Sequence, residues 1–309
     1  MRSSLLAAAT ALAAVACSPS GPSAPDGRDD LVVVAGTHVW MAPPEGMEPA
    51  RNAAGFEAPD GRASISVLEL SQPYREVSTG FLLPDNLQKQ RIELVDQQPR
   101  ANGSLEGVLL SGTQQGVPAV IWIFGGSTSV IVQGSSPEPE RFDQVREAVL
   151  SATFDASLEV DLTDGLEFSL GDDGGLRAWQ RLGPLVCFTE SGTGKGSPMG
   201  EPMFTVGPVP AMPVADRAAF HRQRLAQLPL AEVQEVGTEE VVVDGLPGFA
   251  SVLIAKDPAT GQPRAGFQML LFEADRHWLA IGMCHADRGE EVLPVFERMA
   301  KSLVRKPGR

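Results

Sequence analysis

The chain has 309 residues, with 39 acidic side chains against 25 basic ones, and a formal net charge of −14 at neutral pH. A surface this acidic repels phosphate backbones, and no cluster of Lys and Arg interrupts it. Nucleic acid is therefore excluded as a partner. A single Tyr and four Trp also argue against a cleft that stacks sugar rings.

Residues 1–16 have the pattern of a short export signal. Arg2 is followed by an apolar stretch from Leu5 to Val15, and the small residues before Cys17 form a cleavage site. The apolar stretch is shorter than the roughly 20 residues needed to cross a bilayer. A Cys at the first mature position is the acceptor of lipid in bacterial lipoproteins. We therefore expect acylation of Cys17, which makes the lipid bilayer a partner of the mature chain.

Residues 17–30 are predicted to be a lipidated, disordered tether. The segment from Ser18 to Asp30 is rich in Pro, Ser, Gly and Asp and cannot build a core. It would hold the folded body away from the membrane, at the cell envelope. Ser18, in place of Asp, is typical of lipoproteins sent to the outer membrane, facing the periplasm, if the host is Gram-negative.

The body of the chain contains an apparent duplication. Two β-rich runs joined by a tight connection, which is typical of a hairpin, occupy residues 119–134 and recur 148 positions later at 267–282. Upstream of each hairpin lies a turn pair, Asn102-Gly103 or Asp244-Gly245, and before it a helical region, around Pro84 to Leu94 or Val214 to Leu228.

Each copy is predicted to close with an amphipathic helix. In the first, Ser136 is an N-cap candidate and Pro137 a first helical residue. In the second, Asp287 and Glu290 have capping-box spacing, and Pro294 predicts a kink or a later start. Apolar residues recur at helical spacing in both copies: Phe142, Val145, Val149 and Ala152 in the first, and Val292, Phe296, Met299 and Leu303 in the second.

This order of strands, helix, strands and closing helix resembles the PsbP/DcrB-like superfamily. The resemblance rests on residues 41–47 before a strand pair and on the two hairpin-plus-helix endings, 122–154 and 269–303. It implies an α+β fold in which helices pack on an antiparallel sheet, and a bacterial envelope lipoprotein with two tandem domains, 31–155 and 156–309. The second copy departs from the pattern in its Gly-rich insert, 190–200.

Catalytic and metal-binding motifs are weak. The segment Ser191 to Ser197 resembles a phosphate loop, but Gly follows Lys195 where Ser or Thr should ligate magnesium. The four histidines form no zinc-binding pair: His38, His221, His277 and His285. We read His221 as a core or boundary histidine and His277 as packed across a hairpin. No catalytic residue, metal or cofactor is predicted.

Two thiols remain after Cys17. Cys284 and His285 are neighbours in a strand, so their side chains point to opposite faces and do not share a site. In an oxidising compartment a disulfide between Cys187 and Cys284 is favoured over two separately buried thiols.

Two functions fit these observations. The first is a membrane-anchored envelope lipoprotein that acts as a non-catalytic binding or accessory module for a protein or a small ligand. The alternative is an envelope enzyme or metal-dependent factor whose site residues are dispersed along the chain. The absence of a readable motif favours the first.

Overall fold

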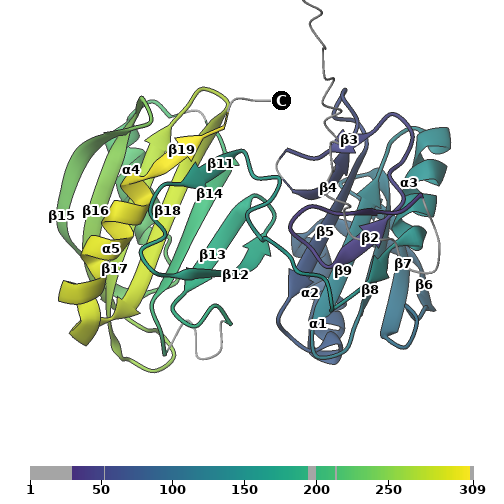
Figure 1. Cartoon of the computed structure of the whole chain (residues 1–309), viewed down its shortest axis with the longest axis horizontal. Helices are drawn as coiled ribbons and strands as arrows, with labels where there is room; N and C mark the ends of the chain where they lie inside the picture. The colour runs from purple at the N-terminus through teal and green to yellow at the C-terminus, as the bar shows by residue number, and fades with distance from the viewer. Residues whose placement is uncertain (1–29, 52, 194–199, 213, 307–309) are drawn as a thin grey trace, which may run out of the picture.

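A computed structural model describes residues 30–51, 53–193, 200–212 and 214–306. Two seven-stranded antiparallel sheets dominate the structure (Figure 1). The first half of the chain forms one sheet and the second half forms the other. Helices pack on the sheets, so the predicted α+β class is confirmed. Within the described residues, no helix is long and apolar enough to cross a membrane.

The first sheet has the strand order β3-β4-β5-β9-β8-β7-β6. Its strands are β3 (Glu48–Pro49), β4 (Ala54–Glu57), β5 (Ser64–Leu70), β6 (Ile92–Pro99), β7 (Glu106–Gln114), β8 (Val117–Gly125) and β9 (Ser129–Ser135). A small sheet pairs β2 with both β1 and β10; these are β1 (Val32–Val33), β2 (Val39–Met41) and β10 (Thr153–Phe154). The helices of this half are α1 (Tyr74–Phe81), α2 (Pro84–Lys89) and α3 (Pro139–Ser151).

The second sheet has the order β12-β13-β14-β18-β17-β16-β15. Its strands are β12 (Arg177–Leu182), β13 (Leu185–Thr189), β14 (Met203–Pro210), β15 (Ala231–Val243), β16 (Leu246–Lys256), β17 (Pro263–Phe272) and β18 (Arg276–His285). A separate pair joins β11 (Phe168–Leu170) to β19 (Leu303–Arg305). The helices are α4 (Arg217–Ala226), a 3₁₀ turn (Ala286–Arg288) and α5 (Gly289–Lys301).

The two sheets have the same topology. Read in chain order, β3 to β9 take the same places in the first sheet as β12 to β18 take in the second. In both halves one helical segment follows the third strand, and a closing helix on the opposite face follows the seventh. A short strand after the closing helix then pairs with a strand from the beginning of that half. The hairpins at 119–134 and 267–282 occupy equivalent places.

Glycine permits the closing helix to approach the sheet in each half. A Cβ on Gly134 in β9 would lie 2.4 Å from a methyl group of Val145 in α3. A Cβ on Gly282 in β18, 148 positions later, would lie 2.2 Å from the ring of Phe296 in α5. Phe296 is fully buried and stacks on Phe204 with ring centroids 5.7 Å apart. The absent side chain is therefore what lets the helix and sheet layers share one core.

The turn pairs also have equivalent roles. Asp244 and Gly245 both have positive φ, 49° and 77°, as expected for the two-residue turn between β15 and β16. The Asp244 carboxylate accepts a hydrogen bond from the backbone N–H of Arg305, just after α5. In the first half, the Asn102 amide donates to the carbonyl of Ala152, just after α3. Each turn thus fastens the chain where it leaves the closing helix.

The outer strands β6 and β15 carry a bulge at matching positions. Strand pairing shifts register at Val95 in β6 and at Val236 in β15. Both side chains turn outward, with 82% and 64% of their surface exposed.

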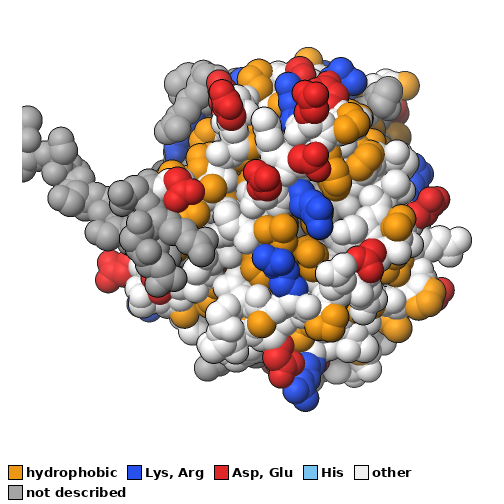
Figure 2. All heavy atoms as spheres, turned by 90° about the vertical axis from the view of Figure 1, so that its right-hand side faces the viewer, with side chains coloured by type: hydrophobic (Ala, Val, Ile, Leu, Met, Phe, Trp, Pro, Cys, Tyr) orange, Lys and Arg blue, Asp and Glu red, His pale blue; other side chains and the backbone are white. Residues whose placement is uncertain are grey.

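On the face of the first half that Figure 2 shows, acidic and basic side chains are interspersed among small apolar areas.

Two helix boundaries differ from the sequence predictions. α3 begins at Pro139 rather than at Pro137, because the Ser136 hydroxyl accepts from the Glu138 N–H and holds a turn ahead of the helix. The helical region expected up to Leu94 ends at Lys89, since Arg91 takes a φ of +55° that stops the helix before β6. α5 starts at Gly289, after the 3₁₀ turn, and keeps Pro294 inside it.

Gly282→Ala is expected to destabilise the chain by roughly 1–3 kcal/mol, because a methyl group there overpacks the contact with Phe296. The matched control is Gly237→Ala in β15, where a Cβ meets nothing within 4 Å. Urea unfolding followed by circular dichroism gives both free energies of unfolding. Equal stability of the two variants would contradict the close-approach role of Gly282.

Candidate functional site

A cavity of about 360 Å³ lies at the junction of the two halves. We call it the seam cavity. The β1–β2 turn and β5 of the first half line it, together with β12 of the second half and the segment that connects the halves. Strand β12 packs beside β5 at this junction (Figure 1). The volume falls within the range of small-molecule sites.

His38 and Glu69 form the polar pair of the seam cavity. The β1–β2 turn carries His38, and its Nδ1 lies 2.8 Å from a Glu69 carboxylate oxygen. The backbone N–H of His38 donates to the other oxygen of the same carboxylate. The pKa of His38 is raised, mainly by this side-chain hydrogen bond and against the effect of burial. The pair therefore presents a hydrogen-bonded imidazole and carboxylate in one place, which suits recognition of a polar ligand.

Trp179 enters the cavity wall because of a bulge. Pairing between β12 and β13 shifts register between Ala178 and Gln180, so Trp179 is the extra residue. Its indole N–H is buried and has no hydrogen-bond partner among the described residues. The neighbouring Gln180 amide donates across the junction to the carbonyl of Glu69, at 3.4 Å.

Arg181 joins the two halves through backbone carbonyls. Its Nη1 donates to Ala35 of the first half at 3.3 Å and to Asp164 of the connecting segment at 2.7 Å. Its Nε donates to Gly183 at 3.0 Å. Only 6% of the residue is exposed. Gly36, with a φ of +74°, makes room for it, since a Cβ there would lie 2.5 Å from Nη1.

A second cavity, of about 450 Å³, shares Arg181 and Ala54 with the first. We call it the β1 cavity because Val32, Val33 and Val34 form one of its walls. The opposite wall comes from the segment around β3 and β4. Apart from Arg181, its lining consists of aliphatic, aromatic, Pro and Gly residues.

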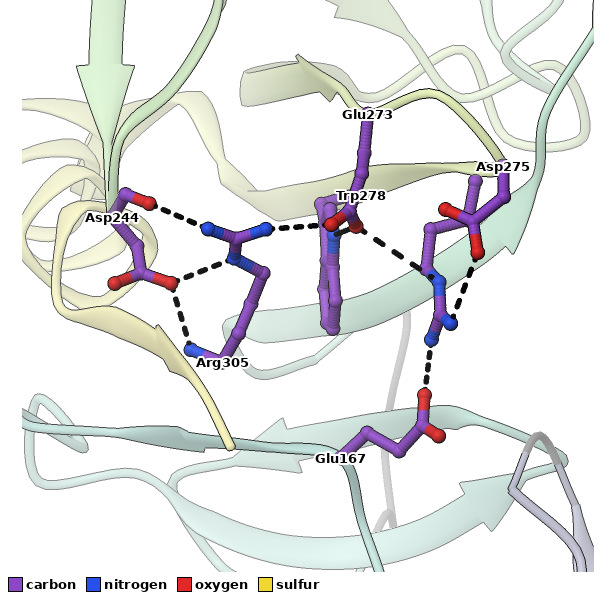
Figure 3. Close-up of polar contacts among 7 residues, drawn as sticks. Glu167, Asp244, Glu273, Asp275, Trp278 and Arg305 are labelled. Atoms are coloured by element: carbon purple, nitrogen blue, oxygen red, sulfur yellow. Dashed lines mark hydrogen bonds and ion pairs between the residues drawn. The ribbon is translucent and has the colours of Figure 1, made fainter. Parts of the chain in front are cut away.

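An ion-pair network fastens β19 to its neighbours in the second half (Figure 3). Arg305 in β19 donates to Asp244 at 2.7 Å and to Glu273 at 2.6 Å. Glu273 also accepts from the indole N–H of Trp278 at 2.9 Å, and Arg276 pairs with Glu167. The same residues line a pocket to which Arg51 of the first half also contributes. The Arg305 hydrogen bond lowers the pKa of Asp244. Every charged group drawn has a partner, so the network holds two turns, β19 and the start of β11 together.

His221 and Ser251 have the spacing of a base and a nucleophile but not the surroundings. His221 Nε2 lies 2.7 Å from Ser251 Oγ. Each residue is only 1% exposed, so a substrate has no access to the pair. No described residue partners His221 Nδ1, so the ring lacks the orienting carboxylate of a triad. His221 is thus a buried core histidine, as predicted.

The remaining histidines also lie where the sequence indicated. His277 is buried across the β17–β18 hairpin, with ring centroids 5.1 Å from Phe272 and 5.7 Å from Phe220. His285 points away from the core that holds Cys284, and Nδ1 lies 3.3 Å from the exposed Asp287 carboxylate. Within the described ranges, no three His, Cys, Asp or Glu residues come together as a metal site.

The expected disulfide does not form in this structure, in which Cys187 and Cys284 are both free and buried. Cys187 in β13 is level with Ile281 in β18 across the intervening strand β14. Cys284 lies three residues further along β18, so its side chain points to the opposite face of the sheet. Burial raises the pKa of both thiols, that of Cys284 to about 11. The sequence indicated only that both cysteines lie in strands. It did not indicate which face of the sheet each side chain occupies or which strands are neighbours.

Sequence reasoning did not find the seam cavity. Glu69, Trp179 and Arg181 are single residues in strands without a recognisable motif. The fold of the first half brings Glu69 to His38, and the packing of β12 beside β5 adds Trp179 and Arg181. Cys17, the signal 1–16 and the tether up to residue 29 lie outside the described residues, as does most of the phosphate-loop-like segment, at 194–199.

No protein-family model matches the chain, and no curated protein matches it significantly. Among solved structures, the chain is similar to LpqN of Mycobacterium tuberculosis, a protein involved in cell envelope biogenesis. Identity is 12%, coverage is 45% of this chain and 83% of that chain, and the TM-score is 0.37. Cyanobacterial PsbP from Synechocystis gives 11% identity, 45% and 82% coverage, and a TM-score of 0.30.

The immunity protein TplEi of Pseudomonas aeruginosa, solved with a peptide, covers more of the chain. Identity is 13%, coverage is 85% of this chain and 99% of that chain, and the TM-score is 0.33. At these identities and TM-scores the likenesses carry no functional argument for this chain.

Burial makes His221 a source of acid sensitivity. Its pKa is lowered from 6.5 to about 4, mainly by desolvation. Because the unfolded chain binds this proton more readily, stability is lost as the pH falls from about 6.5 to about 4, by roughly 3 kcal/mol in total. We expect urea unfolding at pH 7 and pH 4.5 to show a smaller pH dependence in His221→Gln than in the wild type. The control is His285→Gln. The same change in free energy of unfolding between the two pH values in all three chains would contradict the role of His221 in acid sensitivity.

Proposed function

We propose that this protein is a lipid-anchored, non-catalytic binding module of the cell envelope, which takes a ligand or partner at the junction of its two halves. The observation that carries the proposal is the seam cavity, because both halves contribute to it. His38 and Glu69 come from one half and Trp179 from the other. A binding site lined by both halves forms only when both are present, which gives a reason for two similar halves in one chain.

We also propose that residues 31–155 and 156–309 are two copies of one PsbP/DcrB-like domain. The common strand order, the glycines under the closing helices and the matching turn side chains all support a duplication. In that case the two copies contribute different elements to the seam cavity. β5 and the β1–β2 turn of the first copy face β12 of the second.

The anchor is proposed from the sequence. Residues 1–16 read as an export signal, and Cys17 is the residue that would carry the acyl chains. More than one acyl chain gives stable membrane attachment, whereas a single chain holds only marginally. In a host with two membranes, the proposed location is the outer membrane, facing the periplasm.

Cys17→Ser is expected to abolish incorporation of an alkyne-labelled palmitate in growing cells, and to move the protein from the membrane to the soluble fraction. Cys187→Ser is the matched control and should keep both label and membrane location, because its thiol is buried in the fold. Membrane attachment of Cys17→Ser at the wild-type level would contradict the anchor.

The seam cavity is tested with a photocrosslinking amino acid. Placed at Thr128, which lines the cavity, it is expected to give an adduct on irradiation of living cells, identified by mass spectrometry. The same amino acid at Ala259, an exposed position in the turn after β16, is the control. The adduct should weaken when Trp179→Ala is combined with the Thr128 probe. Equal adducts at both positions, or none at Thr128, would contradict a binding site at the junction.

A further inference from the structure

Arg181 is a buried cation without a carboxylate partner. Among the described residues, no carboxylate lies within ion-pair distance of its guanidinium, and three neutral carbonyls accept its hydrogen bonds. These bonds use Nε and Nη1, which leaves Nη2 without a hydrogen bond to any described residue. Burial lowers the pKa of Arg181, and the Asp164 carboxylate opposes this only from a distance. An arginine nevertheless stays protonated in a protein, so an uncompensated charge remains at the junction.

The β1 cavity gives this charge an apolar neighbourhood. Its walls include the side chains of Val32, Val34, Met47 and Phe56, and Arg181 is its single charged lining residue. The Glu69 carboxylate lines the seam cavity and not this one. An anion in the β1 cavity therefore meets a cation, and no acidic side chain lines its walls.

We infer that the β1 cavity binds an amphiphile with one carboxylate and an unbranched alkyl chain, whose head group pairs with Arg181 and whose chain lies along β1 and β4. An apolar wall around a single cation matches this chemistry, because the carboxylate supplies the missing charge partner and the methylenes replace water along the wall. A neutral or cationic amphiphile would leave Arg181 uncompensated. The inference deepens the proposed function, since it rests on the junction being a binding site.

The volume is consistent with a chain of intermediate length. About 450 Å³ is available in the β1 cavity, which lies within the range of sites for small ligands. Each methylene transferred from water contributes about 0.8 kcal/mol, so affinity should rise roughly fourfold per methylene until the cavity is full.

The test is isothermal titration calorimetry with sodium decanoate as the probe. The full chain carries Cys17→Ser, so that no acyl chain of its own competes and the anchor is not under test. We expect one decanoate per chain. Decanol, which lacks the charge, and butanoate, which lacks the chain, should each bind at least about tenfold more weakly, because each loses one of the two contributions. No decanoate binding, or equal binding of decanol, would overturn the inference.

Two pairs of variants locate the site. Arg181→Gln should weaken decanoate binding at least about tenfold, whereas Arg177→Gln, an exposed arginine on the same strand, should not. Ala50→Trp, a half-exposed position in the wall of the β1 cavity, should block the cavity without touching the cation, and Ala259→Trp in an exposed turn is its control.

The variants also separate this inference from the proposed function. If Arg181→Gln fails to fold, the Ala50→Trp result decides. Decanoate binding that survives in a folded Ala50→Trp chain, with the wild-type affinity, would place the ligand elsewhere and overturn the assignment to the β1 cavity. Photocrosslinking at Thr128 reports on the seam cavity, so it can succeed when decanoate binding fails.

Discussion

The junction of the two halves depends on one guanidinium. Arg181 donates to carbonyls of the β1–β2 turn, of the connecting segment and of its own hairpin. Burial of a charge costs free energy unless its donors are satisfied. The positions of Ala35, Asp164 and Gly183 around Arg181 are therefore coupled, and both cavities share the side chain that couples them.

The core of each half is stabilised in a more ordinary way. A closing helix covers one face of each sheet and a second helical segment covers the other, so most apolar side chains of the strands are buried on both faces. Gly134 and Gly282 let the closing helices pack tightly. In the second half, the network around Arg305 and Glu273 adds charged contacts where the chain leaves α5. The halves can thus be stable sheets while the region between them is shaped for binding.

Local patterns in the sequence predicted most of the fold. The hairpins at 119–134 and 267–282 and the closing helices have strong periodicity, and the recurrence of the hairpin 148 positions later indicated the paired architecture. The face of Cys284 relative to His285 followed from the alternation of a strand. Predictions failed where an answer required strand order, because pairing of Cys187 with Cys284 depended on which strand lies between β13 and β18. The start of α3 failed for a local reason, the turn that the Ser136 side chain holds.

The candidate site could not be predicted from the sequence either, because it also depends on which strands lie side by side. His38 and Glu69 are 31 positions apart, and Trp179 follows more than a hundred positions later. Trp179 also sits at a bulge, which changes the face to which later residues of β12 point. Simple alternation along β12 therefore misplaces Arg181.

The bulges at Val95 and Val236 have a consequence for solubility. An outer strand is a template on which another chain can add, and a long one such as β15 is the more dangerous. The register shifts break the even row of backbone donors and acceptors, and the glutamates of β15 add repulsion between like edges. The bulged, acidic edge is therefore a poor template for fibre growth by strand addition.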